Sequence, residues 1–101
     1  MEPDVIIEVR FKTTAEGGRQ TAIGGTAVVD YYACPCVIEG KAFDCRLLLG
    51  KRRLELGEIY EVPVKFMNWQ LVGPKLHEGV SFALWEGKDV ATGKVLRLQL
   101  K

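Results

Sequence analysis

The stretch that decides the fold is Val5-Ile6-Ile7-Glu8-Val9-Arg10-Phe11-Lys12-Thr13. Every second position in it is apolar, namely Val5, Ile7, Val9 and Phe11. The positions between Ile7 and Thr13 alternate with these and carry charges, namely Glu8, Arg10 and Lys12. A period of two residues is typical of a strand with one face in the core and the other in solvent. We therefore predict a half-buried strand over Val5–Thr13.

Four later stretches repeat this alternation: Phe43–Leu49, Glu58–Phe66, Val80–Leu84 and Leu96–Leu100. Turn-like segments that contain glycine separate the stretches, and no window of about a dozen residues shows helical periodicity. With the segment that contains Tyr31, the pattern predicts six strands. Short, evenly spaced strands in a small chain predict an all-β fold, either a closed barrel or a compact sandwich, because closure removes exposed edges.

Two positions carry more specific expectations. Pro63 falls on the outward parity of its stretch and has no N–H to donate, which predicts a strand edge or a bulge there. In the last stretch, Leu96, Leu98 and Leu100 alternate with polar residues, which predicts that the three leucines share the inner face of a strand.

The chain has 101 residues, which suits a single domain over 1–101. Its 14 Lys and Arg residues nearly balance 13 Asp and Glu residues, so a net charge of +1 gives no general attraction to nucleic acid or acidic membranes. No apolar run approaches the roughly 18 residues that span a bilayer, and the acidic start Met1–Asp4 argues against a signal peptide. Three cysteines, an odd number, are typical of free thiols, so we expect a cytoplasmic protein.

Catalytic chemistry has few candidate residues. Cys34, Cys36, Cys45 and the one histidine, His77, together offer four zinc ligands. Structural zinc sites, however, usually draw on Cys-x-x-Cys pairs, whereas Cys34-Pro35-Cys36 is a Cys-x-Cys. No glycine-rich phosphate loop is present. We predict no enzyme, no metal and no cofactor, and a small zinc or thiol protein remains an alternative.

Two groups of residues are candidates for binding. The densest basic run, Lys51-Arg52-Arg53, suits phosphate contacts with RNA. Large aromatic side chains are enriched at protein interfaces, and the candidates for a protein partner are Trp69, Trp85, Tyr31 and Tyr32. Trp85 lies on the outward parity of its strand. Trp69 lies in a loop-like segment, where capping the end of a barrel is its alternative role.

Two segments resemble the C-terminal (third) β-barrel of elongation factor Tu and related translation GTPases. Residues 9–21, VRFKTTAEGGRQT, resemble the family's V-x-x-L-T-x-E-E-G-G-R-H-T. Residues 78–95, EGVSFALWEGKDVATGKV, resemble its E-G-x-R-F-A-I-R-E-G-G-R-T-V-G-A-G-V-V. Leu56-Gly57-Glu58 stands where the family has a Pro-Gly-Asp turn, so the match covers nearly the whole chain in order. The resemblance implies a free-standing six-stranded antiparallel barrel.

The resemblance also implies candidate contacts with RNA. In the family this barrel takes part in holding aminoacyl-tRNA and in docking partner proteins. Arg19 matches the arginine of the Gly-Gly-Arg turn, which lies near the tRNA backbone in the family, and Val90-Ala91 matches the last turn, which also approaches it. The candidate RNA contacts are Arg19, Lys51, Arg52, Arg53 and Lys88. Ser81 and Trp85 stand where the family has arginines.

The leading prediction is a non-catalytic binding module that engages a protein partner of the translation apparatus or of another complex. A weak RNA- or tRNA-binding barrel is the main alternative. A homodimer is a further expectation, because it would use the predicted edge near Pro63 and the outward Trp85. Neither a membrane nor a cofactor is expected as a partner.

Overall fold

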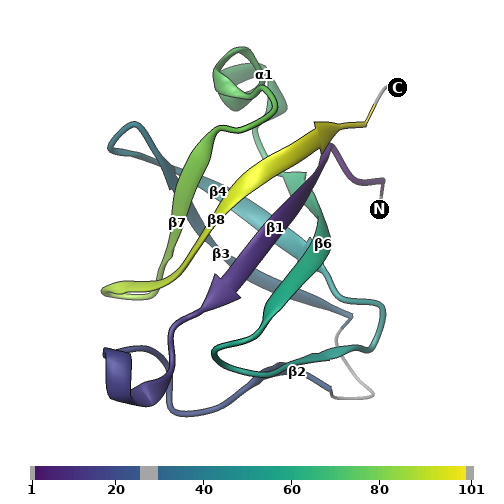
Figure 1. Ribbon diagram of the computed structural model, residues 1–101. Coiled ribbons are helices and arrows are strands. Elements are labelled where there is room, and N and C mark those ends of the chain that lie inside the picture. The colour runs from purple at the N-terminus through teal and green to yellow at the C-terminus, as the bar shows by residue number, and fades with distance from the viewer. Residues whose placement is uncertain (1, 26–29, 100–101) are drawn as a thin grey trace.

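A computed structural model describes residues 2–25 and 30–99 and shows a closed antiparallel β-barrel (Figure 1). Six strands form it, in the order β1-β6-β4-β3-β7-β8. They are β1 (Val5–Phe11), β3 (Tyr31–Ile38), β4 (Lys41–Leu48), β6 (Ile59–Phe66), β7 (Ser81–Trp85) and β8 (Asp89–Leu98). The predicted all-β fold is confirmed, and it is a barrel rather than a sandwich.

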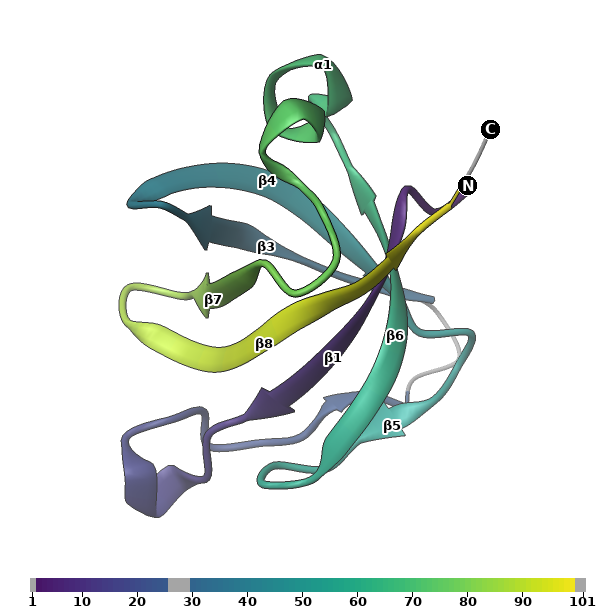
Figure 2. The same cartoon turned by 45° about the horizontal axis from the view of Figure 1, so that its top comes forward.

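Short elements lie at the two ends of the barrel (Figures 1 and 2). At one end β2 (Ile23–Gly24) pairs with β5 (Arg53–Leu54), and the 3-10 helix η1 (Thr14–Glu16) lies nearby. The helix α1 (Trp69–Val72) and the 3-10 helix η2 (Gly73–Lys75) lie at the other end. Within the described residues no helix has the length and apolar character needed to cross a membrane.

The alternation in β1 determines which side chains fill the barrel. Every second residue of β1 is at most 2% exposed: Val5, Ile7, Val9 and Phe11. Inward-facing residues of the other strands, such as Leu47, Val62 and Leu84, pack in the same core. The predicted inner face of β1 is therefore confirmed.

Closure of the barrel requires β1 to pair with two strands. Val9 lies opposite Tyr60 of β6 on one side and opposite Gly93 of β8 on the other. At Gly93 the two backbones are so close that an added Cβ would overlap the Glu8 carbonyl oxygen and lie 2.7 Å from Phe82 Cζ. Glycine is thus required at this point of closure because any side chain would separate β8 from β1.

The prolines of β3 and β6 each lie one residue beyond a paired stretch. The β6 register with β4 covers Val64 to Phe66, and Pro63 is the next residue, which pairs only with Ile6 of β1. Likewise β3 pairs with β7 at Cys36 and Val37, directly after Pro35. A missing N–H is tolerated where a strand has a free side. At Pro63 the side of β6 that faces β4 is unpaired, as expected of an edge, whereas the side that faces β1 is paired with Ile6.

The second half of β8 departs from the simple alternation. The register of β8 against β1 shifts by one residue near Leu96, which forms a bulge. Val95 is consequently buried at 2% exposure, whereas Leu98 is 39% exposed. Leu98 pairs with Val5, whose side chain faces the core, so its parity is inward as predicted, but at this end of the barrel it is exposed. Leu96 lies at the bulge, and Leu100 lies outside the described residues.

A buried carboxylate fastens the start of β1 to its neighbours. Asp4 is fully buried, and its carboxylate accepts hydrogen bonds from the Phe66 backbone N–H at 2.8 Å and from Lys65 Nζ at 3.2 Å. Its backbone N–H donates to the Val64 carbonyl, and its own carbonyl accepts from the Gln99 N–H. Asp4 therefore links β1, β6 and the end of β8.

The Gly93→Ala substitution should destabilise the barrel by about 1–3 kcal/mol, the usual cost of overpacking. The added methyl group has to separate β8 from β1 or displace Phe82. Urea unfolding followed by tryptophan fluorescence measures this change. Thr92→Ala, at the exposed neighbouring position, is the control and should stay within about 0.5 kcal/mol of wild type. Equal stabilities of the two variants would contradict the tight closure.

Candidate protein-binding surface

The outward side of β3 carries no charged side chain. The residues that point outward are Tyr31, Ala33, Pro35 and Val37. Tyr31 is 43% exposed, and Ala33 is also exposed. The solvent-facing side of an antiparallel strand normally carries polar residues. An uncharged row of this kind is therefore a candidate contact surface.

The two strands beside β3 extend this apolar area. Ala83 of β7 and Ala42 of β4 both lie opposite Val37. Continuing the β3–β7 register by one residue places Trp85, which is 45% exposed, beside Pro35. Figure 2 shows β4, β3 and β7 side by side. We call their outward residues the β3 face: Tyr31, Ala33, Pro35, Val37, Ala42, Asp44, Arg46, Leu48, Ser81, Ala83 and Trp85.

The β3 face contains one acidic and one basic residue, both from β4. Arg46 lies opposite Ala33, and Asp44 lies opposite Pro35. The Arg46 guanidinium carbon is 5.5 Å from the centre of the Tyr31 ring, so this side chain lies along the face as a cation–π contact. The two charges are thus two residues apart on one strand and flank the centre of an otherwise apolar surface.

Arg19, the candidate RNA contact on the Gly-Gly-Arg turn, is engaged within the molecule. Its guanidinium forms an ion pair with Glu86 at 2.5 Å and donates to the Thr21 carbonyl at 3.3 Å. Its guanidinium carbon also lies 5.4 Å from the centre of the Tyr32 ring. These contacts fasten the loop after β1 to the β7–β8 turn, and they occupy the side chain that an RNA phosphate would need.

Tyr32 faces the interior and is not one of the exposed aromatic residues. Its ring packs edge-on against Phe11, with ring centres 5.7 Å apart. Its hydroxyl is buried and has no hydrogen-bond partner among the described residues. The Tyr32 ring therefore lies between Phe11 in the core and the Arg19 guanidinium. Its neighbour Tyr31 points outward and belongs to the β3 face.

The remaining basic candidates do not form one patch. Arg52 donates hydrogen bonds to two backbone carbonyls, and Arg53 pairs with Glu55 at 2.6 Å. Lys51 and Lys88 are exposed. Lys51 belongs to the β4–β5 connection and Lys88 to the β7–β8 turn, and Figures 1 and 2 place these two turns on opposite sides of the barrel.

Trp69 packs against the end of the barrel. It lies in α1, is half-buried and contacts the core. A Cβ at Gly73 would lie 3.0 Å from Trp69 Cε2, so Gly73 provides the space that the indole occupies. This placement fits the capping role better than the partner-binding role. The exposed apolar residues at this end are Leu71, at 65%, and Met67, at 40%.

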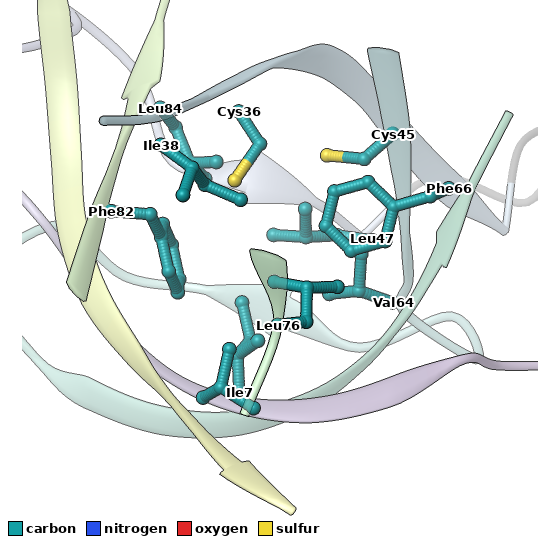
Figure 3. A pocket seen from close by; sticks show the side chains of 11 residues that line it. Ile7, Cys36, Ile38, Cys45, Leu47, Val64, Phe66, Leu76, Phe82 and Leu84 are labelled. Atoms are coloured by element: carbon teal, nitrogen blue, oxygen red, sulfur yellow. The ribbon is translucent and has the colours of Figure 1, made fainter. Parts of the chain in front are cut away.

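The three cysteines are buried inside the barrel. Cys36 and Cys45 point into its interior, where they line a small apolar cavity together with residues such as Phe66 (Figure 3). This cavity measures about 10 Å³, whereas ligand pockets usually exceed about 300 Å³. It therefore has no room for a small-molecule ligand.

The environment of Cys34 and Cys45 raises the pKa of both thiols, which keeps these two thiols protonated. A hydrogen bond with Cys45 raises the pKa of the Cys34 thiol, and burial raises this pKa further. Because the thiolate is the nucleophile and the metal ligand, protonated thiols are unreactive. In the described part of the chain, no three His, Cys, Asp or Glu side chains gather as metal ligands, and His77 is exposed.

Most of the β3 face was not predicted from the sequence. Tyr31 and Trp85 were candidates for binding, whereas Ala33, Pro35 and Val37 were not. A signal was present, because both parities of Tyr31–Ile38 are uncharged, so that one apolar row must face outward from any sheet with a single core side.

The ion pair between Arg19 and Glu86 should couple two distant segments energetically. Both side chains are partly exposed, so the expected coupling is about 0.5–1 kcal/mol. A double-mutant cycle with Arg19→Ala and Glu86→Ala, read by urea unfolding, measures it. The pair Arg53→Ala and Glu55→Ala, which is more exposed, is the control and should give a smaller coupling. Additive effects at Arg19 and Glu86 would contradict the predicted coupling.

A capping box fixes the turn that carries Arg19, and it should titrate at low pH. The hydrogen bond from the Thr13 backbone N–H, then the contact with Arg10, lowers the pKa of Glu16 from 4.5 to about 2. The stabilisation is therefore complete above pH 4.5 and is lost as the pH falls through about 2. An NMR titration of the Glu16 carboxyl carbon and the Thr13 amide tests this expectation. In Glu16→Gln the Thr13 transition should disappear, and a wild-type midpoint near 4.5 would contradict the capping.

No protein-family profile matches the chain, and no curated protein matches it significantly. A six-stranded barrel does not by itself identify the third domain of elongation factor Tu, so that relationship stays a prediction based on the two quoted segments.

Proposed function

We propose that this protein is a non-catalytic binding module that docks another protein through the β3 face. The observation that carries the proposal is the uncharged outward row of β3, extended by Ala83 and Trp85 of β7. Apolar surface that carries exposed aromatic residues, here Tyr31 and Trp85, is typical of a protein interface. The resemblance to elongation factor Tu makes partners from the translation apparatus the first candidates.

The basic residues support RNA binding less well. Affinity for RNA depends on several cations that neutralise neighbouring phosphates. Here Arg19, Arg52 and Arg53 contact acceptors of the protein itself, and the exposed Lys51 and Lys88 lie on opposite sides. A weak RNA-binding barrel therefore remains the second proposal.

The thiol and zinc alternative has the least support. Among the described residues Cys34, Cys36 and Cys45 lie inside the barrel with no fourth metal-binding side chain beside them. Buried thiols suit packing in a core rather than chemistry.

Site-specific photo-crosslinking tests the proposed face. A photo-reactive phenylalanine analogue at Val37 should crosslink to protein in cells that express the chain, whereas the same probe at Ile59 should not. Ile59 is the matched control because it is an exposed apolar residue, at 65%, on β6 and outside the β3 face. Adding Ala33→Arg should reduce the Val37 crosslink at least tenfold, because a charge would be buried in the interface.

Two controls make this test decisive. Ala33→Arg and wild type should show the same thermal unfolding, since Ala33 is exposed. Absence of crosslinks from Val37, together with salt-sensitive tRNA binding that Lys88→Ala weakens, would overturn the proposal in favour of RNA binding. Equal crosslinking from Val37 and Ile59 would also contradict a docking site at the β3 face.

A further inference from the structure

We infer that the partner of the β3 face is a second copy of this chain, packed face to face about a twofold axis. The inference rests on the proposed protein-binding role of that face. It follows from the order of residues along β3 and β4, which makes the face complementary to itself. In a twofold interface, residue i contacts residue j of the other copy and residue j contacts residue i.

The proposed twofold axis crosses the β3 face at the level of the Cys34–Cys45 pair. On β3 the outward residues at equal distances from this level are Ala33 and Pro35, followed by Tyr31 and Val37. If the twofold axis runs across the strands here, β3 of one copy lies antiparallel to β3 of the other. Each apolar residue then meets an apolar residue.

The charged residues obey the same symmetry. Arg46 lies level with Ala33, and Asp44 lies level with Pro35. Rotation about the axis therefore places Arg46 of one copy at the level of Asp44 of the other. Asp44 of one copy therefore faces Arg46 of the other, twice per dimer. Opposite charges across an interface fix its orientation, whereas like charges there would oppose it. The net charge of +1 per chain adds little repulsion between copies.

The area of the face predicts a weak dimer. β3 and β4 have eight residues each and β7 has five, so the three strands cover at most about 14 by 27 Å, or about 400 Å² per copy. The convex outside of a small barrel limits contact further, although Trp85 and Tyr31 extend from it. An interface of this size belongs to the weak, transient class, so we expect a dissociation constant of at least about 10 µM.

Sedimentation velocity with exchanged charges tests both the dimer and its orientation. Wild type should shift from monomer to dimer between about 5 µM and about 1 mM. Asp44→Arg alone, with two positive charges per copy at the centre, and Arg46→Asp alone, with two negative charges per copy, should each associate at least tenfold more weakly. An equimolar mixture of these two variants should regain association, more strongly at low salt, because each charge then meets its opposite.

The outcomes separate this inference from the proposed function. Ala33→Arg should abolish self-association, and the Val37 probe should crosslink to a product of twice the chain mass. A wild-type monomer at every concentration, with Val37 still crosslinking to another protein, would overturn the dimer and leave the binding module intact. A mixture that regains no association would overturn the antiparallel orientation. No self-association and no crosslink from Val37 would overturn both proposals.

Discussion

Pairing of β1 with both β6 and β8 is the constraint on which the rest of the structure depends. It turns an open sheet into a barrel, so each strand acquires one side that faces the core and one that faces outward. The close approach of β1 and β8 leaves no space for a side chain at Gly93. The buried carboxylate of Asp4 links the start of β1 to β6. Once the barrel is closed, the parity of each residue decides whether it stabilises the fold or meets solvent.

Closure of the barrel also determines which charged residues make contacts within the protein. Loops at the ends of a barrel need contacts that hold them in place, and Arg19, Arg52 and Glu16 supply those contacts. Residues that resemble RNA contacts in sequence are therefore used to organise turns. The wall of the barrel at β3 is left apolar, with Asp44 and Arg46 as its two charges.

Much of the fold could be predicted from the sequence, because alternation with a period of two identifies strands and their inner faces. The bulge near Leu96 was not predicted, because an inserted residue leaves no sign in the alternation itself. The candidate site was harder to predict. The engagement of Arg19 depends on Glu86, which lies 67 residues away, and only the closed barrel brings the two together. The β3 face could have been predicted, because both sides of that strand are uncharged and one of them must face outward.

The positions of Pro35 and Pro63 have a consequence for how this chain meets others. Both prolines lie next to places where a neighbouring strand stops pairing, and a strand exposed there would otherwise offer N–H groups to an incoming chain. Proline withholds the donor at the first unpaired position, which discourages edge-to-edge strand addition and the aggregation that follows from it. The side chains on the wall of the barrel, rather than its backbone, are thereby left as the groups that another molecule can contact.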